Sequence, residues 1–109
     1  MSVQEINQDN FEEIVTKSDK PIVMDTSASW CGPCRMMEPV FNELSEEMTD
    51  IVFAKLDIEA NRELASKFHI TAIPCIIIFN KGEEVDRIIG FKQKQDLKQS
   101  IEAILGGLK

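Results

Sequence analysis

The sequence predicts an α/β domain in which four helices flank a single mixed five-stranded sheet. Along the first part of the chain, short apolar segments alternate with segments of helical periodicity, which predicts parallel strands joined by right-handed helical crossovers. Later, two apolar segments are separated only by a tight turn, which predicts an antiparallel hairpin. No linker, repeat or low-complexity tract divides the 109 residues, so we expect one domain over residues 1–109.

The first two strands are expected at residues 2–6 and 21–27, with a short helix between them. Asp9 and Glu12 have the spacing of a capping pair at the start of that helix. The second strand opens with an unbroken apolar run rather than an alternating pattern, which predicts that it is buried on both faces.

A longer helix should begin near Cys34 and follow the second strand. Pro39 lies inside it and should kink it, because the proline ring clashes with the carbonyl group of Arg35. The apolar residues of this helix recur at helical spacing and are Met37, Val40, Phe41, Leu44 and Met48.

The second half of the chain completes the sheet. We expect a strand at residues 51–58, a short helix at residues 60–68, and a hairpin of residues 75–79 and 84–90. The hairpin turn is expected at residues 80–82, where Asn-Lys-Gly interrupts the apolar pattern. The closing helix should bury one face that contains Leu97, Ile101, Ile104, Leu105 and Leu108.

Composition limits the classes of function. Hydrophobic residues make up 43% of the chain, which is enough for a folded core. The formal net charge of −7 argues against nucleic acid, because phosphate binding needs clustered basic residues. No segment reaches the ~20 apolar residues that cross a bilayer, and the acidic N-terminus is unlike a signal peptide. We therefore expect no nucleic acid, no membrane and a cytoplasmic location, where thiols are kept reduced.

The motif WCGPC, residues 30–34, is the strongest functional signal. A closed zinc site usually needs four ligands, and outside this pair the chain offers only Cys75 and His69 as cysteine or histidine ligands. Cys31 follows a strand and opens a helix, where free N–H groups and a partial positive charge favour a thiolate. Cys34 lies one helical turn further on. This arrangement favours dithiol–disulfide exchange over an ordinary zinc site.

Beyond this motif, the sequence resembles the thioredoxin family along essentially its whole length. The residues that carry the resemblance are Trp30 to Cys34, Asp25, Pro39, Lys55, Ile73, Pro74, Gly82 and Gly90. The resemblance implies the thioredoxin fold and the activity of a protein-disulfide reductase, or electron carrier. It also implies no bound cofactor and no metal, because the redox-active group would be a reversible disulfide between Cys31 and Cys34.

The same resemblance implies a role for each catalytic residue. Cys31 would attack a client disulfide as the nucleophile, and Cys34 would resolve the mixed disulfide. Asp25 would transfer the proton of Cys34, and Lys55 in the neighbouring strand would tune Asp25. The residues themselves also make Asp25 unusual, since a carboxyl group among apolar neighbours should have its pKa raised by desolvation.

A client-binding surface is implied around the cysteine pair. Pro74 would be a cis-proline that faces the pair, and the backbone of Ile73 would offer a strand edge to an extended client segment. The implied substrate-binding residues are Trp30, Gly32, Pro33, Ile73, Pro74 and Gly90. The implied partners are client proteins with disulfides and a thioredoxin reductase, either an NADPH-dependent flavoenzyme or a ferredoxin-linked enzyme. The chain itself would act as a monomer.

Four positions depart from the family pattern. Thr26 and Ser27 stand where most members carry aromatic residues, so we expect looser and wetter packing beneath the site. Arg35 replaces the commoner lysine and keeps its charge. Cys75 follows Pro74, where threonine is usual. Cys75 has three interpretations: a buried small hydrophobic residue, a third thiol that modulates exchange, or a third ligand for a soft metal or iron–sulfur cluster.

Two other functional classes stay open at this point. A metal- or cluster-binding protein would use Cys31, Cys34 and Cys75 together. A binding subunit would use the fold as a scaffold and would keep its partner after both Cys31 and Cys34 are replaced by serine, whereas a redox carrier would lose its activity.

Overall fold

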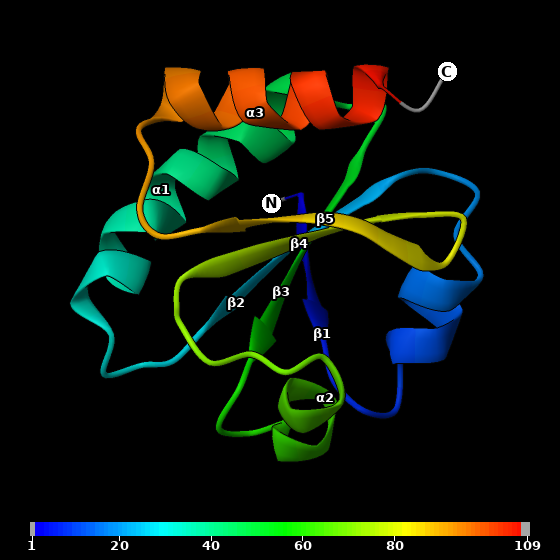
Figure 1. Ribbon diagram of the computed structural model, residues 1–109, viewed down its shortest axis with the longest axis vertical. Coiled ribbons are helices and arrows are strands. Elements are labelled where there is room, and N and C mark those ends of the chain that lie inside the picture. The colour runs from blue at the N-terminus through cyan, green and yellow to red at the C-terminus, as the bar shows by residue number, and fades with distance from the viewer. Residues whose placement is uncertain (1, 108–109) are drawn as a thin grey trace.

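The computed structural model describes residues 2–107 and arranges them around one central sheet (Figure 1). The strand order is β1-β3-β2-β4-β5. β1, β3 and β2 run parallel, whereas β4 is antiparallel to β2 and β5 is antiparallel to β4. This confirms the predicted mixed five-stranded sheet. The strands are β1 (Val3–Ile6), β2 (Ile22–Ser27), β3 (Val52–Asp57), β4 (Cys75–Asn80) and β5 (Glu83–Ile89).

Four helical segments of the described residues flank the sheet, as predicted. They are η1 (Glu12–Thr16), which is a single π-helical turn, α1 (Gly32–Glu47), α2 (Arg62–Lys67) and α3 (Lys94–Gly106). α1 and α3 cover one face of the sheet, and η1 and α2 cover the other (Figure 1). Over residues 2–107, these helices are too short or too polar to cross a membrane.

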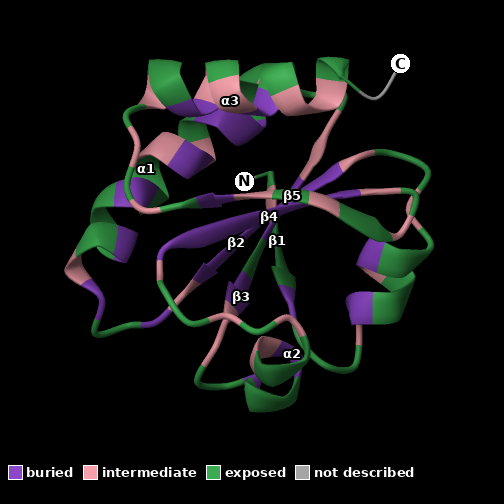
Figure 2. Ribbon diagram, in the orientation of Figure 1, coloured by how far each residue is buried: buried purple, intermediate pink, exposed green. Residues whose placement is uncertain are grey.

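Two apolar clusters lie one on each face of the sheet, and Figure 2 shows that the central strands are largely buried. The cluster under α1 and α3 contains Val23, Met37, Phe41, Leu44, Phe53, Ile76, Ile78, Ile88, Leu97 and Ile101. The cluster under η1 and α2 contains Ile6, Phe11, Val15, Ile22, Met24, Ala54, Leu56, Leu64, Cys75, Ile77 and Phe79. Burying each of the larger side chains contributes about 1.5–3 kcal/mol.

The pairing of β2 with β4 determines which segments meet at the end of the sheet. Thr26, near the end of β2, pairs with Cys75, the first residue of β4. The strands are antiparallel, so the segment that leaves β2 toward Cys31 starts beside the segment that enters β4 through Pro74. The fold thus brings together two motifs that are far apart in the sequence.

The turn before η1 differs from the expectation. Asn7 caps it, because Asn7 Oδ1 accepts hydrogen bonds from the backbone N–H groups of Asp9 at 2.8 Å and Asn10 at 2.9 Å. No side chain makes a capping hydrogen bond to η1. The expected capping pair of Asp9 and Glu12 is therefore wrong, since an asparagine two residues earlier supplies the acceptor.

α1 begins at Gly32, slightly before the expected start near Cys34. The reason is that Cys31 occupies the N-cap position, so the first helical turn includes the residues between the two cysteines. Pro39 lies inside the helix, as expected. Leu108, expected on the apolar face of the last helix, lies outside the described residues.

The hairpin between β4 and β5 turns through Lys81 and Gly82, within the expected turn. Their φ angles are 53° and 83°, which is the left-handed region that two-residue hairpin turns require. A Cβ atom on Gly82 would lie 2.5 Å from the carbonyl oxygen of Thr16. Gly82 is therefore required both by its backbone conformation and by the close approach of η1.

Candidate active site

The cysteine pair lies at the junction of β2 and α1. Cys31 has an extended backbone, with φ of −90° and ψ of 110°, and is the N-cap residue of α1. Its Sγ accepts a hydrogen bond of 3.2 Å from the backbone N–H of Cys34 in the first helical turn. A disulfide joins the two residues, whose Cα atoms are 5.2 Å apart. Once the disulfide is reduced, the free N–H groups and the helix dipole favour a thiolate on Cys31.

Both cysteines are largely covered in the disulfide state. Each is 5% exposed, so the two cysteines do not differ in exposure. The two differ in direction instead, because Cys34 lines a cavity between α1 and the sheet. Trp30, directly before the pair, is 64% exposed. The pair thus has a covered side, toward the cavity, and a neighbouring aromatic side chain on the surface.

The cavity has a volume of about 320 Å³ and lies between the start of α1 and the three parallel strands. Each strand contributes residues two apart, since side chains alternate between the faces of a sheet. These strand residues are Val3 and Glu5, Asp25 and Ser27, and Lys55 and Asp57. The contributing residues of α1 are Cys34, Arg35, Glu38, Phe41 and Asn42. The cavity is therefore a polar site of mixed charge beside the disulfide.

Asp25 is the buried acid of this cavity. The residue is 6% exposed, and its Oδ1 has no hydrogen-bond partner among the described residues. Burial, followed by the negative charge of Glu38, raises the pKa of Asp25 to about 7, against the opposing charge of Lys55. This agrees with the expectation from its apolar neighbours. A carboxyl group with this pKa can take up or release a proton near neutral pH.

Lys55 and Glu38 act on Asp25 from opposite walls of the cavity. Lys55 is the register partner of Asp25 between β2 and β3, and it is exposed. The sequence also indicates that Glu38 lies near Cys34, although the motif search did not include this residue. Glu38 follows Cys34 by four residues, the spacing that places two side chains on the same face of a helix.

A second loop meets the sheet near the cysteine pair. The peptide bond between Ile73 and Pro74 is cis, as the resemblance implied. The backbone N–H of Gly90 donates a hydrogen bond of 2.8 Å to the carbonyl oxygen of Pro74. Gly90 has a φ of 93°, which glycine adopts without strain. This bond fixes the residue after β5 to the loop before β4.

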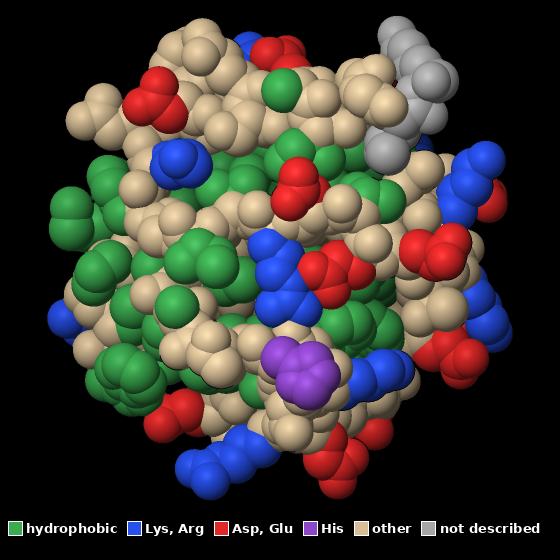
Figure 3. All heavy atoms as spheres, viewed as in Figure 1, with side chains coloured by type: hydrophobic (Ala, Val, Ile, Leu, Met, Phe, Trp, Pro, Cys, Tyr) green, Lys and Arg blue, Asp and Glu red, His purple; other side chains and the backbone are tan. Residues whose placement is uncertain are grey.

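Large hydrophobic side chains remain exposed near these elements (Figure 3). Besides Trp30, they are Met36, Ile89 and Phe91. Figure 3 shows hydrophobic side chains gathered at the left of the view, on the side where α1 begins and β5 leads toward α3. The sequence alone did not indicate that Ile89 is exposed, because an apolar residue in a strand is normally assigned to the core.

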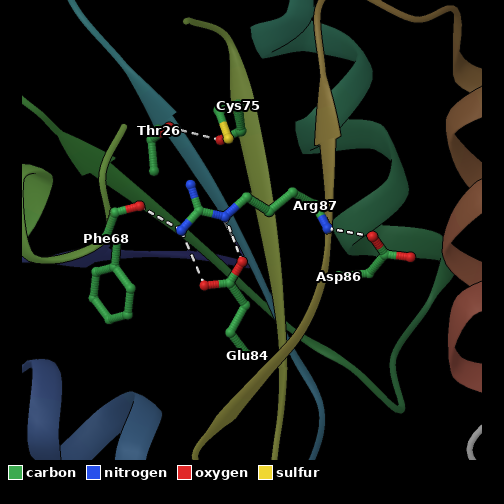
Figure 4. A network of polar contacts seen from close by, with 6 residues as sticks. All are labelled: Thr26, Phe68, Cys75, Glu84, Asp86 and Arg87. Carbon is green, nitrogen blue, oxygen red and sulfur yellow. Dashed lines mark hydrogen bonds and ion pairs between the residues drawn. The ribbon is translucent and has the colours of Figure 1, made fainter. Parts of the chain in front are cut away.

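Cys75 lies on the opposite face of the sheet from the cavity. It is 2% exposed and packs in the cluster under η1 and α2. Its carbonyl oxygen accepts a hydrogen bond of 2.7 Å from Thr26 Oγ1 (Figure 4). Burial raises the pKa of the Cys75 thiol, against the opposing influence of the Arg87 guanidinium. These surroundings favour the interpretation of Cys75 as a buried small residue.

Arg87 lies close to Cys75 on this face of the sheet (Figure 4). Its guanidinium forms an ion pair with Glu84 and donates a hydrogen bond to the carbonyl oxygen of Phe68 at the end of α2 (Figure 4). Glu84 and Arg87 are three residues apart in one strand, a spacing that normally places side chains on opposite faces. The strand pairing is irregular between Ile78 and Phe79, and this bulge lets both charged groups meet.

Thr26 and Ser27 have different surroundings, so the looser packing expected beneath the site applies to only one of them. Thr26 is fully buried on the face under η1 and α2, and its hydroxyl group is hydrogen-bonded to Cys75. Ser27 points to the other face and lines the cavity with Asp25. The absence of an aromatic ring at position 27 therefore affects the cavity, whereas Thr26 is well packed.

A metal site made of the three cysteines gains no support from the structure. Within residues 2–107, no group of three or more His, Cys, Asp and Glu side chains is placed to hold a metal ion. Cys31 and Cys34 are bonded to each other, and Cys75 packs on the other face of the sheet.

Comparison with known proteins agrees with this arrangement. The family model described as Thioredoxin matches residues 2–103. The chain belongs to the thioredoxin family. Its five-stranded sheet with four helical segments is the thioredoxin fold, and the Cys31–Cys34 disulfide takes the place of the redox-active group of this family. The chain is a thiol–disulfide oxidoreductase of the protein-disulfide reductase class.

Individual relatives resemble the chain along most of its length. Thioredoxin C-3 of Corynebacterium nephridii is 40% identical over 98 residues, which are 90% of this chain and 68% of the relative. Thioredoxin of Mycobacterium bovis is 40% identical over 100 residues, which are 91% of this chain and 86% of the relative. The bifunctional thioredoxin reductase/thioredoxin of Mycobacterium leprae is 38% identical over 105 residues, which are 95% of this chain and 23% of that protein.

Proposed function

We propose that this chain reduces disulfides of client proteins through Cys31 and Cys34 and is reduced again by a thioredoxin reductase. The proposal depends chiefly on the Cys31–Cys34 disulfide at the N-terminus of α1, next to a buried acid and to exposed apolar side chains. The bifunctional relative, whose name joins a thioredoxin reductase to a thioredoxin, supports such a reductase as the electron donor.

The exchange starts from the reduced protein. The Cys31 thiolate attacks one sulfur of the client disulfide, so that a Cys31–client bond forms and the other client sulfur leaves as a thiolate. Cys34 then loses its proton and attacks Cys31 Sγ, which forms the Cys31–Cys34 disulfide and releases the second client sulfur. The client gains two electrons and leaves as two thiolates, which take up protons from solvent. The reductase returns two electrons to the cysteine pair, so that Cys31 becomes a thiolate again and Cys34 takes up one proton.

Asp25 accepts the proton in the second step. It lines the same cavity as Cys34, and with a pKa of about 7 a share of its carboxyl groups is ionised at neutral pH. The proton passes from Cys34 Sγ to this carboxylate as the Cys34 thiolate forms. Lys55 lowers the pKa of Asp25 and so keeps a larger share of the carboxyl groups ready to accept a proton.

Client proteins bind around the disulfide through a small apolar surface and one strand edge. The backbone of Ile73 pairs with an extended client segment, and Trp30 supplies exposed apolar contact area. A Cβ atom on Gly32 would meet nothing within 4 Å, so packing does not require glycine there. In this proposal its missing side chain leaves room for a client sulfur to approach Cys31. The proposed client-binding residues are Trp30, Gly32, Pro33, Ile73, Pro74 and Gly90.

The proposal also covers the organisation and location of the protein. Residues 1–109 act as one domain and as a monomeric electron carrier in the cytoplasm, where a reductase keeps the dithiol reduced. The donor is either an NADPH-dependent flavoenzyme or a ferredoxin-linked enzyme.

Reduction of insulin by dithiothreitol, with and without the protein, tests the proposal. We expect metal-free protein to accelerate the reaction, and the Cys31→Ser and Cys34→Ser variants to lose this acceleration. Reduction of the oxidised protein by each type of reductase then identifies the donor. An inactive parent protein, together with a double Cys31→Ser, Cys34→Ser variant that still binds its partners, would favour a scaffold role instead.

A further inference from the structure

The cavity beside the disulfide contains a carboxylate that the exchange mechanism leaves unused. Glu38 lies on α1 four residues after Cys34, and both side chains line the cavity together with Asp25. Asp25 is 6% exposed, and its Oδ1 has no hydrogen-bond partner among the described residues. No hydrogen bond to this oxygen fixes the carboxyl group in one protonation state, so a nearby charge can decide between the two states.

We propose that Glu38 is a positioning residue for the proton step, because its negative charge at the rim of the cavity moves proton transfer between Cys34 and Asp25 to higher pH. This inference rests on the role that the proposed function gives to Asp25. Glu38 touches neither the client nor the sulfur atoms in this role. It acts through Asp25 alone.

Other charged groups also line the cavity of Asp25, and Glu38 is the one that acts on Asp25 most strongly. β4 contributes none, because the partner of Asp25 there is Ile76. The titratable and charged groups that share the cavity are Glu5 of β1, Lys55 and Asp57 of β3, and Cys34, Arg35 and Glu38 of α1. Among the charges, Glu38 has the largest influence on the pKa of Asp25, and Lys55 opposes it. Asp25 thus lies between one charge that favours its neutral form and one that favours its ionised form.

The consequence for the reaction has a definite direction. The transferred proton leaves Cys34 Sγ and binds the Asp25 carboxylate, while the Cys34–Cys31 bond forms and the Cys31–client bond breaks. A negative charge nearby makes the carboxylate a stronger base but reduces the ionised share at a given pH. Removal of the Glu38 charge should therefore move the rising limb of the resolution rate to lower pH.

The titration of Asp25 in the oxidised protein tests the inference directly, since the cysteines of the disulfide do not titrate. We would follow the carboxyl carbon of Asp25 by NMR from pH 4 to pH 10. Glu38→Gln should lower the midpoint by roughly half a pH unit, the size expected for a solvent-screened unit charge. Glu38→Asp should stay near the parent, and Lys55→Gln should raise the midpoint.

The matched control is Glu46→Gln, which removes the same charge from an exposed position of α1 outside the cavity. It should leave the midpoint unchanged. High salt should move the parent midpoint toward that of Glu38→Gln, because salt screens exposed charges. A midpoint in Glu38→Gln equal to that of the parent would overturn the inference, whatever the reaction rates.

A kinetic measurement separates this failure from failure of the proposed function. The pH dependence of mixed-disulfide resolution should shift in Glu38→Gln in the same direction as the Asp25 midpoint. A shifted midpoint with unchanged rate profiles in both Glu38→Gln and Asp25→Asn would remove Asp25 from the mechanism, and the inference would fail with it. A changed profile in Asp25→Asn with an unshifted midpoint in Glu38→Gln would leave Asp25 in place and exclude Glu38.

Discussion

Asp25 and Lys55 are register partners in the parallel pairing of β2 with β3, and both line the cavity beside Cys34. Their environments differ, because Asp25 is buried whereas Lys55 is exposed. Water screens the lysine charge, so its attraction does not offset the desolvation of the carboxylate. The result is a pKa of about 7 for Asp25, well above the ordinary value of 3.8. This acid is therefore suited to proton transfer near neutral pH, but its burial lowers the free energy of unfolding once the pH rises above the ordinary pKa.

The Asp25→Asn variant should be more stable than the parent at pH 8 but not at pH 4. The folded protein holds the Asp25 proton up to about pH 7, while the unfolded chain loses it near pH 3.8, so stability falls as pH rises between these values. Asparagine removes this loss in the free energy of unfolding, which is as much as about 4 kcal/mol at pH 8. Urea unfolding of parent and variant at both pH values measures the difference, with the exposed Asp19→Asn as the control. An equal gain at both pH values would contradict the prediction.

The Cys34→Ser variant should accumulate mixed disulfides with client proteins. Cys31 still attacks, but no thiol remains to resolve the bond that it forms. Mass spectrometry of adducts from a purified disulfide-containing client should locate the bond at Cys31. The buried Cys75 remains in this variant, so adducts at Cys75, or a failure to recover any adduct, would count against the proposed order of attack.

The Cys75→Ser variant should keep the redox potential of the Cys31–Cys34 couple. Cys75 packs on the opposite face of the sheet from the cavity, so its replacement leaves the surroundings of Cys34 in place. The stability should fall by about 1–3 kcal/mol, because a hydroxyl group replaces a thiol in an apolar cluster. A redox titration against glutathione, combined with urea unfolding, measures both quantities. A shifted potential with unchanged stability would restore Cys75 as a modulator of exchange.

The Gly82→Ala variant should lose about 1–3 kcal/mol of stability. The added Cβ would lie 2.5 Å from the Thr16 carbonyl oxygen, on a residue with a φ of 83°. Gly106→Ala is the matched control, since a Cβ there meets nothing within 4 Å and alanine is favoured in helices. Thermal unfolding compares the two. Equal melting temperatures in both variants would show that η1 moves away from the turn at little cost.

The sequence predicts the sheet and the cysteine pair well because both depend on local patterns. Apolar runs and the turn at Lys81 and Gly82 mark the strands, and the spacing of Cys31 and Cys34 marks the helix start. The surroundings of Thr26 and Ser27 could also have been predicted. Alternation along β2 sends the two side chains to opposite faces, so only one of the missing aromatic rings affects the cavity.

Other features depend on contacts between distant segments and have weaker signals. Ile89 has the pattern of a core residue in a strand, and only the packed structure leaves it exposed. The influence of Glu38 on Asp25 requires α1 to lie against β2, although its spacing from Cys34 indicated the correct helix face. The turn before η1 depends on the Asn7 side chain, which a search for a Ser, Thr or Asp cap with a following Glu overlooks.

Alkylation of the fully reduced protein tests the central claim most directly, namely that Cys31 is the activated and accessible thiol. Limiting iodoacetamide at pH 7, followed by peptide mapping, ranks the three cysteines by reactivity. The account predicts that Cys31 is modified first and faster than free cysteine, while Cys34 and Cys75 react much more slowly. Modification of Cys34 first, or a Cys31 that reacts no faster than free cysteine, would contradict it.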